Sequence, residues 1–133
     1  MSNKGYVYFG LYGDFVPEEV TAVIGLQPTD SVRKGESTVR VPSKFSRWRW
    51  SSEKSDDLVN VYEVSRSVVD QLIPFEKGIA HAMKQYGLEA VLQVVIFLSG
   101  EDEVSSPALG FDETVIAFLG RLNASVDVDL YKG

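Results

Sequence analysis

The longest apolar run in the chain, Glu89 to Gly100, constrains the fold more than any other stretch. Its sequence, EAVLQVVIFLSG, is rich in β-branched and aromatic residues, which favour a β-strand, and it has about the length of one strand. Successive side chains of a strand point to opposite faces, and both faces of this run are mostly apolar. We therefore expect a central strand that is covered on both sides.

Alternating patterns predict further strands at Tyr6–Leu11, Arg47–Ser51 and Ser125–Tyr131, with a weaker signal at Thr38–Val41. The strand that begins at Arg47 places Trp48 and Trp50 on one face and Arg47 and Arg49 on the other. In the last strand, the apolar side chains would point inward. These residues are Val126, Val128 and Leu130.

Helical spacing of apolar residues predicts helices at Pro17–Ile24, Leu58–Ile73, Pro74–Tyr86 and Glu113–Leu122. Asp56 or Asp57 could cap the second helix, and Asp112 could cap the last, because a short acidic side chain can accept a hydrogen bond from a free backbone N–H at a helix start.

A short internal similarity relates EVTAVIG, Glu19 to Gly25, to TVIAFLG, Thr114 to Gly120. Each segment follows a predicted strand, so the chain could contain two β-α-β units. We predict an α+β fold in a single domain, residues 1–133. It would have a mostly antiparallel sheet of four to five strands and a ferredoxin-like β-α-β repeat, with an inserted helical pair covering the sheet. Tyr6–Leu11 and Glu89–Gly100 would be its inner strands.

Composition narrows the class of protein. The formal net charge of −6 makes the chain a poor general ligand of nucleic acid or of anionic membranes. The chain has no cysteine, which excludes disulfides, thiolate metal sites and thiol catalysis. No signal-peptide pattern and no membrane-spanning run is apparent, so we expect a cytoplasmic protein without membrane contact.

Several segments resemble a known bacterial family. They are YVYFGLYGDFVPEEVTAVIGLQPT near the start, RKGE at Arg33–Glu36, WRWSSE at Trp48–Glu53 and the closing LNASVDVDLY. Their order resembles that of the family called domain of unknown function 4279. The chain departs from the family pattern at Val16, where a polar cap is usual, and at Trp50, where an aliphatic residue is common. The resemblance implies a bacterial single-domain protein of unassigned function, with no catalytic residues to carry over.

A basic stretch follows the first helix. Its cations are Arg33, Lys34, Arg40, Lys44, Arg47 and Arg49, and its aromatic residues are Phe45, Trp48 and Trp50. Arginine interleaved with aromatic residues is typical of surfaces that bind single-stranded nucleic acid. The alternative is structural: the tryptophans pack in the core, and the arginines pair with nearby acids.

A second candidate site lies on the last strand, where Asp127, Asp129 and Tyr131 share one face. Two carboxylates at this spacing could bind a metal or share acid–base chemistry. They could equally be solvated, or form ion pairs with Arg47 and Arg49. The single histidine, His81, has no nucleophile assigned to it, and no nucleotide-binding loop is present. We expect no cofactor and no metal.

These observations favour a non-enzymatic binding or interaction protein. An immunity-type protein, in which a small acidic chain masks a basic toxin surface, fits this class. The alternative is a nucleic-acid-associated protein that uses the stretch 33–50, and a small hydrolase or metal enzyme around Asp127 and Asp129 ranks last. The candidate binding residues are Arg33, Lys34, Arg47, Trp48, Arg49, Trp50, Asp127, Asp129 and Tyr131.

Overall fold

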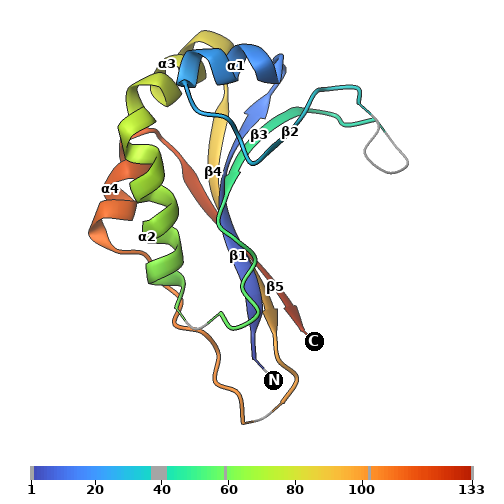
Figure 1. Ribbon diagram of the computed structural model, residues 1–133, viewed down its shortest axis with the longest axis vertical. Coiled ribbons are helices and arrows are strands. Elements are labelled where there is room, and N and C mark those ends of the chain that lie inside the picture. The colour runs from blue at the N-terminus through green and yellow to red at the C-terminus, as the bar shows by residue number, and fades with distance from the viewer. Residues whose placement is uncertain (1, 37–41, 59, 102, 133) are drawn as a thin grey trace.

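A five-stranded sheet forms one layer of the molecule (Figure 1). The computed structural model describes residues 2–36, 42–58, 60–101 and 103–132, and the predicted strand at 38–41 lies outside them. The strands are β1 (Lys4–Gly13), β2 (Asp30–Val32), β3 (Ser46–Ser51), β4 (Glu89–Leu98) and β5 (Ser125–Lys132). They lie in the order β2-β3-β1-β4-β5. The strands predicted at Tyr6–Leu11 and Glu89–Gly100 correspond to β1 and β4, and their predicted inner positions are confirmed.

The sheet is mostly antiparallel, as predicted. β1 pairs antiparallel with both β3 and β4, β2 pairs antiparallel with β3, and β4 and β5 are parallel. The ferredoxin-like arrangement is not confirmed. β3 lies between β1 and β2, as in a split β-α-β unit, but β4 and β5 are direct neighbours.

The helices lie on one side of this sheet (Figure 1). They are α1 (Pro17–Ile24), α2 (Val61–Leu72), the 3-10 turn η1 (Ile73–Phe75), α3 (Glu76–Tyr86) and α4 (Glu113–Arg121). The inserted pair is α2 and α3: α2 packs on β1, whereas α3 packs mainly on α1. Gly78 permits the second contact, because a Cβ there would lie 2.9 Å from the backbone of Ile24.

Most helix ends follow the local rules. Asp112 accepts a hydrogen bond from the N–H of Val115, as predicted, and Gly25 ends α1 in the left-handed conformation. The predicted cap of the second helix is wrong. Asn60, not Asp56 or Asp57, accepts the hydrogen bond from the N–H of Glu63, because the preceding residues are tied to β1: Ser55 pairs with Gly5, and Leu58 donates to Asn3.

The core lies between the sheet and the helices. Val7, Phe9 and Leu11 of β1 are fully buried there, and the ring of Phe9 meets Phe118 of α4 edge to face. Trp48 of β3 is also fully buried, and its indole N–H donates to Thr21 of α1. Both tryptophans thus lie on the helix side, as the structural alternative predicted.

The central strand is buried on both faces near its middle, where Gln93 and Val95 are 7% and 6% exposed, but helices cover only one of these faces. Ala90, Leu92, Val94 and Ile96 of β4 face the helices and are buried. The opposite face of β4 is turned away from the helices, and its side chains there are flanked by those of β1 and β5. A long apolar run can therefore occur in a sheet with only one helical layer.

The burial of Trp48 yields a test of this core. Replacing Trp48 with alanine should lower the free energy of unfolding by about 3–5 kcal/mol, because the change leaves a cavity where a large aromatic side chain packed. The half-buried Trp50, whose indole N–H donates to Gln71, is the matched control and should cost less. Urea denaturation measures both, and equal losses for Trp48→Ala and Trp50→Ala would contradict this packing.

An ion pair between helices predicts a pH dependence. Arg121 of α4 donates two hydrogen bonds, of 2.8 and 2.7 Å, to Glu76 of α3 and lowers the pKa of that carboxyl. A lowered pKa stabilises the fold above the unfolded value of about 4.3, and this contribution is lost as the pH falls through the folded value. Thermal unfolding between pH 7 and pH 3 should show a shallower loss of stability for Glu76→Gln than for the exposed Glu18→Gln control. Identical profiles would exclude this pair as a contributor.

Candidate functional site

The face of the sheet turned away from the helices carries aromatic, cationic and acidic side chains; we call it the open face. Strand register places the side chains of β1 at its centre. Those of β2 and β3 lie on one side and those of β4 and β5 on the other. Its members are Lys4, Tyr6, Tyr8, Tyr12, Asp30, Arg47, Arg49, Ser51, Glu89, Val91, Gln93, Val95, Phe97, Asp127, Asp129 and Tyr131.

Tyrosines line the centre of the open face. The rings of Tyr6 and Tyr8 stack with their centroids 6.1 Å apart, and the hydroxyl of Tyr12 donates to that of Tyr8 at 3.5 Å. Gly10 makes this possible, because a Cβ there would lie 2.7 Å from the Tyr12 hydroxyl. Burial, and then the hydrogen bond with Tyr8, raise the pKa of Tyr12 well above its usual value. The Tyr12 phenol is therefore neutral near pH 7 and unsuited to act as a base.

Arg49 is held in place on this face by two partners. Its guanidinium donates to both carboxylate oxygens of Asp30 on β2, at 2.8 and 2.5 Å, and it lies 4.8 Å from the ring centroid of Tyr8. The hydrogen bonds to Asp30 raise the pKa of Arg49 still further. A bidentate pair beside an aromatic ring orients the charge before any partner binds.

Arg47, two residues earlier on β3, is less well paired. Its Nε atom is buried and has no hydrogen-bond partner among the residues that the structure describes. Register places it beside Tyr12 on β1 and Val32 on β2. A buried polar atom without a partner is costly, so Arg47 is a polar group that a ligand could satisfy.

Aromatic residues and cations also meet near the start of β1. Phe97 and Tyr131 stack at 5.1 Å and are 43% and 49% exposed. The Lys54 ammonium lies 5.6 Å from the Tyr6 ring centroid. Lys4 lies beside Phe97 in the register. Exposed aromatic area therefore extends from β1 to the edge of the sheet.

The acids of the second candidate site lie on the far side of this face. Asp127 is exposed and Asp129 is half-buried. The predicted ion pairs with Arg47 and Arg49 are wrong, since β1 and β4 separate β3 from β5. Three strand spacings amount to about 14 Å, too far for a direct pair. Asp30, one strand away from Arg49, takes the expected role.

The other predicted site residues are divided between locations. Trp48 and Trp50 lie on the helix side and do not join the arginines. Arg33 and Lys34 follow β2, and the Lys34 ammonium lies 3.2 Å from the Asp14 carboxylate. The structure therefore brings together Arg47, Arg49, Asp127, Asp129 and Tyr131 on one face.

A comparison of the chain with models of protein families identifies its family. The family model described as "Domain of unknown function (DUF4279)" matches residues 3–133. The chain belongs to this family. No curated protein and no solved structure matched it. The resemblance noted in the sequence is confirmed. The family is described as one of unknown function.

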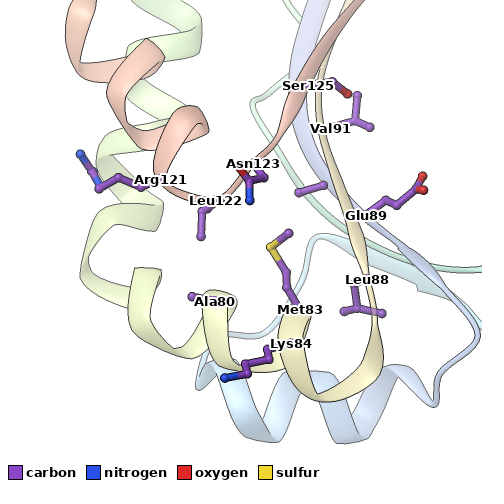
Figure 2. Close-up of a pocket in the computed structure, with 11 residues that line it drawn as sticks. Ala80, Met83, Lys84, Leu88, Glu89, Val91, Arg121, Leu122, Asn123 and Ser125 are labelled. Atoms are coloured by element: carbon purple, nitrogen blue, oxygen red, sulfur yellow. The ribbon is translucent and has the colours of Figure 1, made fainter.

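In this DUF4279 chain the helix layer has its own hollow, of about 520 Å³, between α3, the first residues of β4 and the α4–β5 turn. Figure 2 shows the Arg121 guanidinium and the Glu89 carboxylate on opposite sides of it, both directed away from its centre. Ligands of parallel strands usually bind beyond the carboxyl ends of those strands, whereas this hollow lies at the amino ends of β4 and β5. The open face is the better candidate site.

Sequence reasoning missed the tyrosines, although the signal was present. Tyr6, Tyr8 and Tyr12 recur at even positions of a strand whose odd positions, Val7, Phe9 and Leu11, are buried. Aromatic residues on the outward positions of such a strand are the sign of an exposed aromatic face. Among the described residues, no group of three or more potential ligands could hold a metal ion, and no helix there could cross a membrane.

The Arg49–Asp30 pair can be tested with a double-mutant cycle. Arg49→Glu and Asp30→Arg should each destabilise the protein, and the combination should recover about 0.5–1 kcal/mol, a small value because both side chains are partly exposed. Arg49→Glu combined with Asp129→Arg is the matched control and should show no coupling. Coupling to Asp129 instead, measured by urea denaturation, would contradict the strand order.

Proposed function

We propose that this protein is a non-enzymatic binding module that contacts a protein partner through the open face. One observation carries the proposal: helices cover one side of the sheet, and the other side presents clustered tyrosines beside an oriented arginine, Arg49. Tyrosine and arginine are among the residues that contribute most at protein interfaces. The pairs Tyr8–Tyr12 and Arg49–Asp30 are formed without a partner, which lowers the entropy cost of binding.

The size of the face supports a protein partner. The five strands have ten, three, six, ten and eight residues, and each residue covers about 16 Å² of the sheet, so the face measures roughly 590 Å². The resulting area is of the order of the ~800 Å² that one protein contributes to a standard interface.

Charge supports a partner with a basic surface. Asp127 and Asp129 lie at the β5 side of the face, and the whole chain has a formal net charge of −6. Complementary charge accelerates association and selects partners. An immunity-type protein in the cytoplasm of a bacterium, masking a basic toxin, is the specific form of this proposal.

The non-enzymatic part of the proposal is supported by the chemistry of the face. General acid–base catalysis needs groups that titrate near neutral pH. The pKa values of Tyr12 and Arg49 are both raised away from that range. His81 lies exposed on α3, in the helix layer.

A second candidate function, binding of single-stranded nucleic acid, is favoured by the cations beside half-buried tyrosines. Arg49 lies over Tyr8, and Lys54 lies over Tyr6, and bases stack on such aromatic side chains. The acids at the β5 side and the net negative charge oppose this function.

A capture experiment separates these functions. The wild-type chain, Tyr6→Ser and the control Ile116→Ser are immobilised and exposed to native lysate at low and moderate salt. Ile116 is an exposed apolar residue on α4, so both variants remove a large side chain, one from each side of the molecule. We expect a protein that wild type and Ile116→Ser retain and that Tyr6→Ser binds at least ten-fold more weakly, about 1.4 kcal/mol.

The opposite results are equally clear. Equal retention by Tyr6→Ser and Ile116→Ser would exclude the open face as the contact surface. Recovery of RNA or DNA that falls steeply with salt and depends on Tyr6 would replace the protein partner with nucleic acid.

A further inference from the structure

β5 is a long strand, and one of its edges is unpaired among the residues that the structure describes. It has eight residues and ends the strand order, next to β4 alone. The opposite edge of the sheet is β2, which has only three residues. An unpaired edge presents free N–H and C=O groups that can accept another strand. Of the two edges, β5 offers the longer row of backbone groups.

The two faces of β5 differ in chemistry. Asp127 and Asp129 point to the open face, and neither forms an ion pair with any residue that the structure describes. Val126 and Leu130 point to the helix side but are 40% and 57% exposed. They point inward, as predicted from the sequence, but the helices leave them largely uncovered. An added strand would cover this apolar area and lie beside the two acids.

A second copy of the chain is a poor occupant of this edge. In a dimer, two copies of β5 could pair antiparallel with both helix layers on the same side of the joined sheet. If this pairing is centred on any residue from 127 to 129, a carboxylate of one copy lies directly opposite a carboxylate of the other. Like charges in opposed positions destabilise a strand pair. The charge pattern therefore acts against self-association and selects for basic residues in the added strand.

We propose that β5 accepts an extended segment of a partner protein as a sixth strand of the sheet. The segment carries basic residues opposite Asp127 and Asp129, and apolar residues beside Val126 and Leu130. Backbone hydrogen bonds supply affinity, and the alternating side chains supply specificity. This inference rests on the proposed protein-binding function and specifies the chemistry of the partner.

Synthetic peptides of about eight residues provide the probe. One alternates lysine and valine, and a matched one alternates glutamate and valine. We expect the lysine peptide to slow amide exchange of alternate residues within 125–132, measured by NMR, and to bind at least ten-fold more tightly than the glutamate peptide, about 1.4 kcal/mol. Two further versions of the lysine peptide carry N-methyl groups on alternate backbone nitrogens, one on the odd and one on the even positions. Only one of the two versions should lose the protection of β5, because only one set of peptide N–H groups faces β5.

Charge reversal provides the second arm. Asp127→Lys combined with Asp129→Lys should reverse the preference toward the glutamate peptide. Asp56→Lys combined with Asp57→Lys, on an exposed loop, changes the net charge equally and should preserve the preference for lysine. Asp127→Asn combined with Asp129→Asn removes the two negative charges without introducing positive ones, and it should remove the preference for lysine. This variant serves as the test if charge reversal impairs folding.

Three results would overturn the inference. They are unchanged exchange at 125–132 with the lysine peptide, a lysine preference that survives charge reversal, and a wild-type dimer in sedimentation with protected β5 amides. Failure here is distinct from failure of the proposed function. A captured protein that depends on Tyr6 but not on Asp127 and Asp129 would retain the open face and exclude strand addition.

Discussion

One-sided burial of the sheet is the constraint on which the rest of the structure depends. β1 alternates Val7, Phe9 and Leu11 toward the helices with Tyr6, Tyr8 and Tyr12 toward the opposite face. Because β1 lies between β3 and β4, this alternation is carried across the sheet by register. The strand that builds the core therefore also builds the aromatic centre of the open face.

The same geometry organises the charges of the molecule. Arg49 and Asp30 lie on neighbouring strands and form a bidentate pair, while Asp127 and Asp129 lie on β5, three strands away from Arg49. At that distance the acids cannot neutralise the arginines directly. The open face thus has a cationic side and an acidic side, and the acidic side coincides with the long free edge. A binding surface and a strand-accepting edge adjoin each other in this arrangement.

Local signals in the chain were reliable where the relevant interactions are local. Pro17 begins α1, Gly25 ends it and Asp112 caps α4, as predicted, because each role depends on backbone groups within a few residues. The capping prediction for the second helix was wrong because Ser55 bonds to Gly5 of β1 and Leu58 bonds to Asn3, just before β1. These are contacts between segments far apart in the sequence. β2 was not predicted, since three residues contain too little periodicity to indicate a strand.

By itself the sequence determined which side chains share a face, because alternation along a strand is a local property of the backbone. It separated Trp48 from Arg49 and Asp127 from Val128, and it identified the family. Only the tertiary structure decided which faces the helices cover and which strands are neighbours. Those outcomes depend on non-local packing and hydrogen bonding: Val95 is buried on the face turned away from the helices, where register places it beside Tyr6 and Asp129. For this reason the pairing of Arg49 with Asp30, the contacts among the tyrosines of β1 and the free edge at β5 became apparent only in the folded chain.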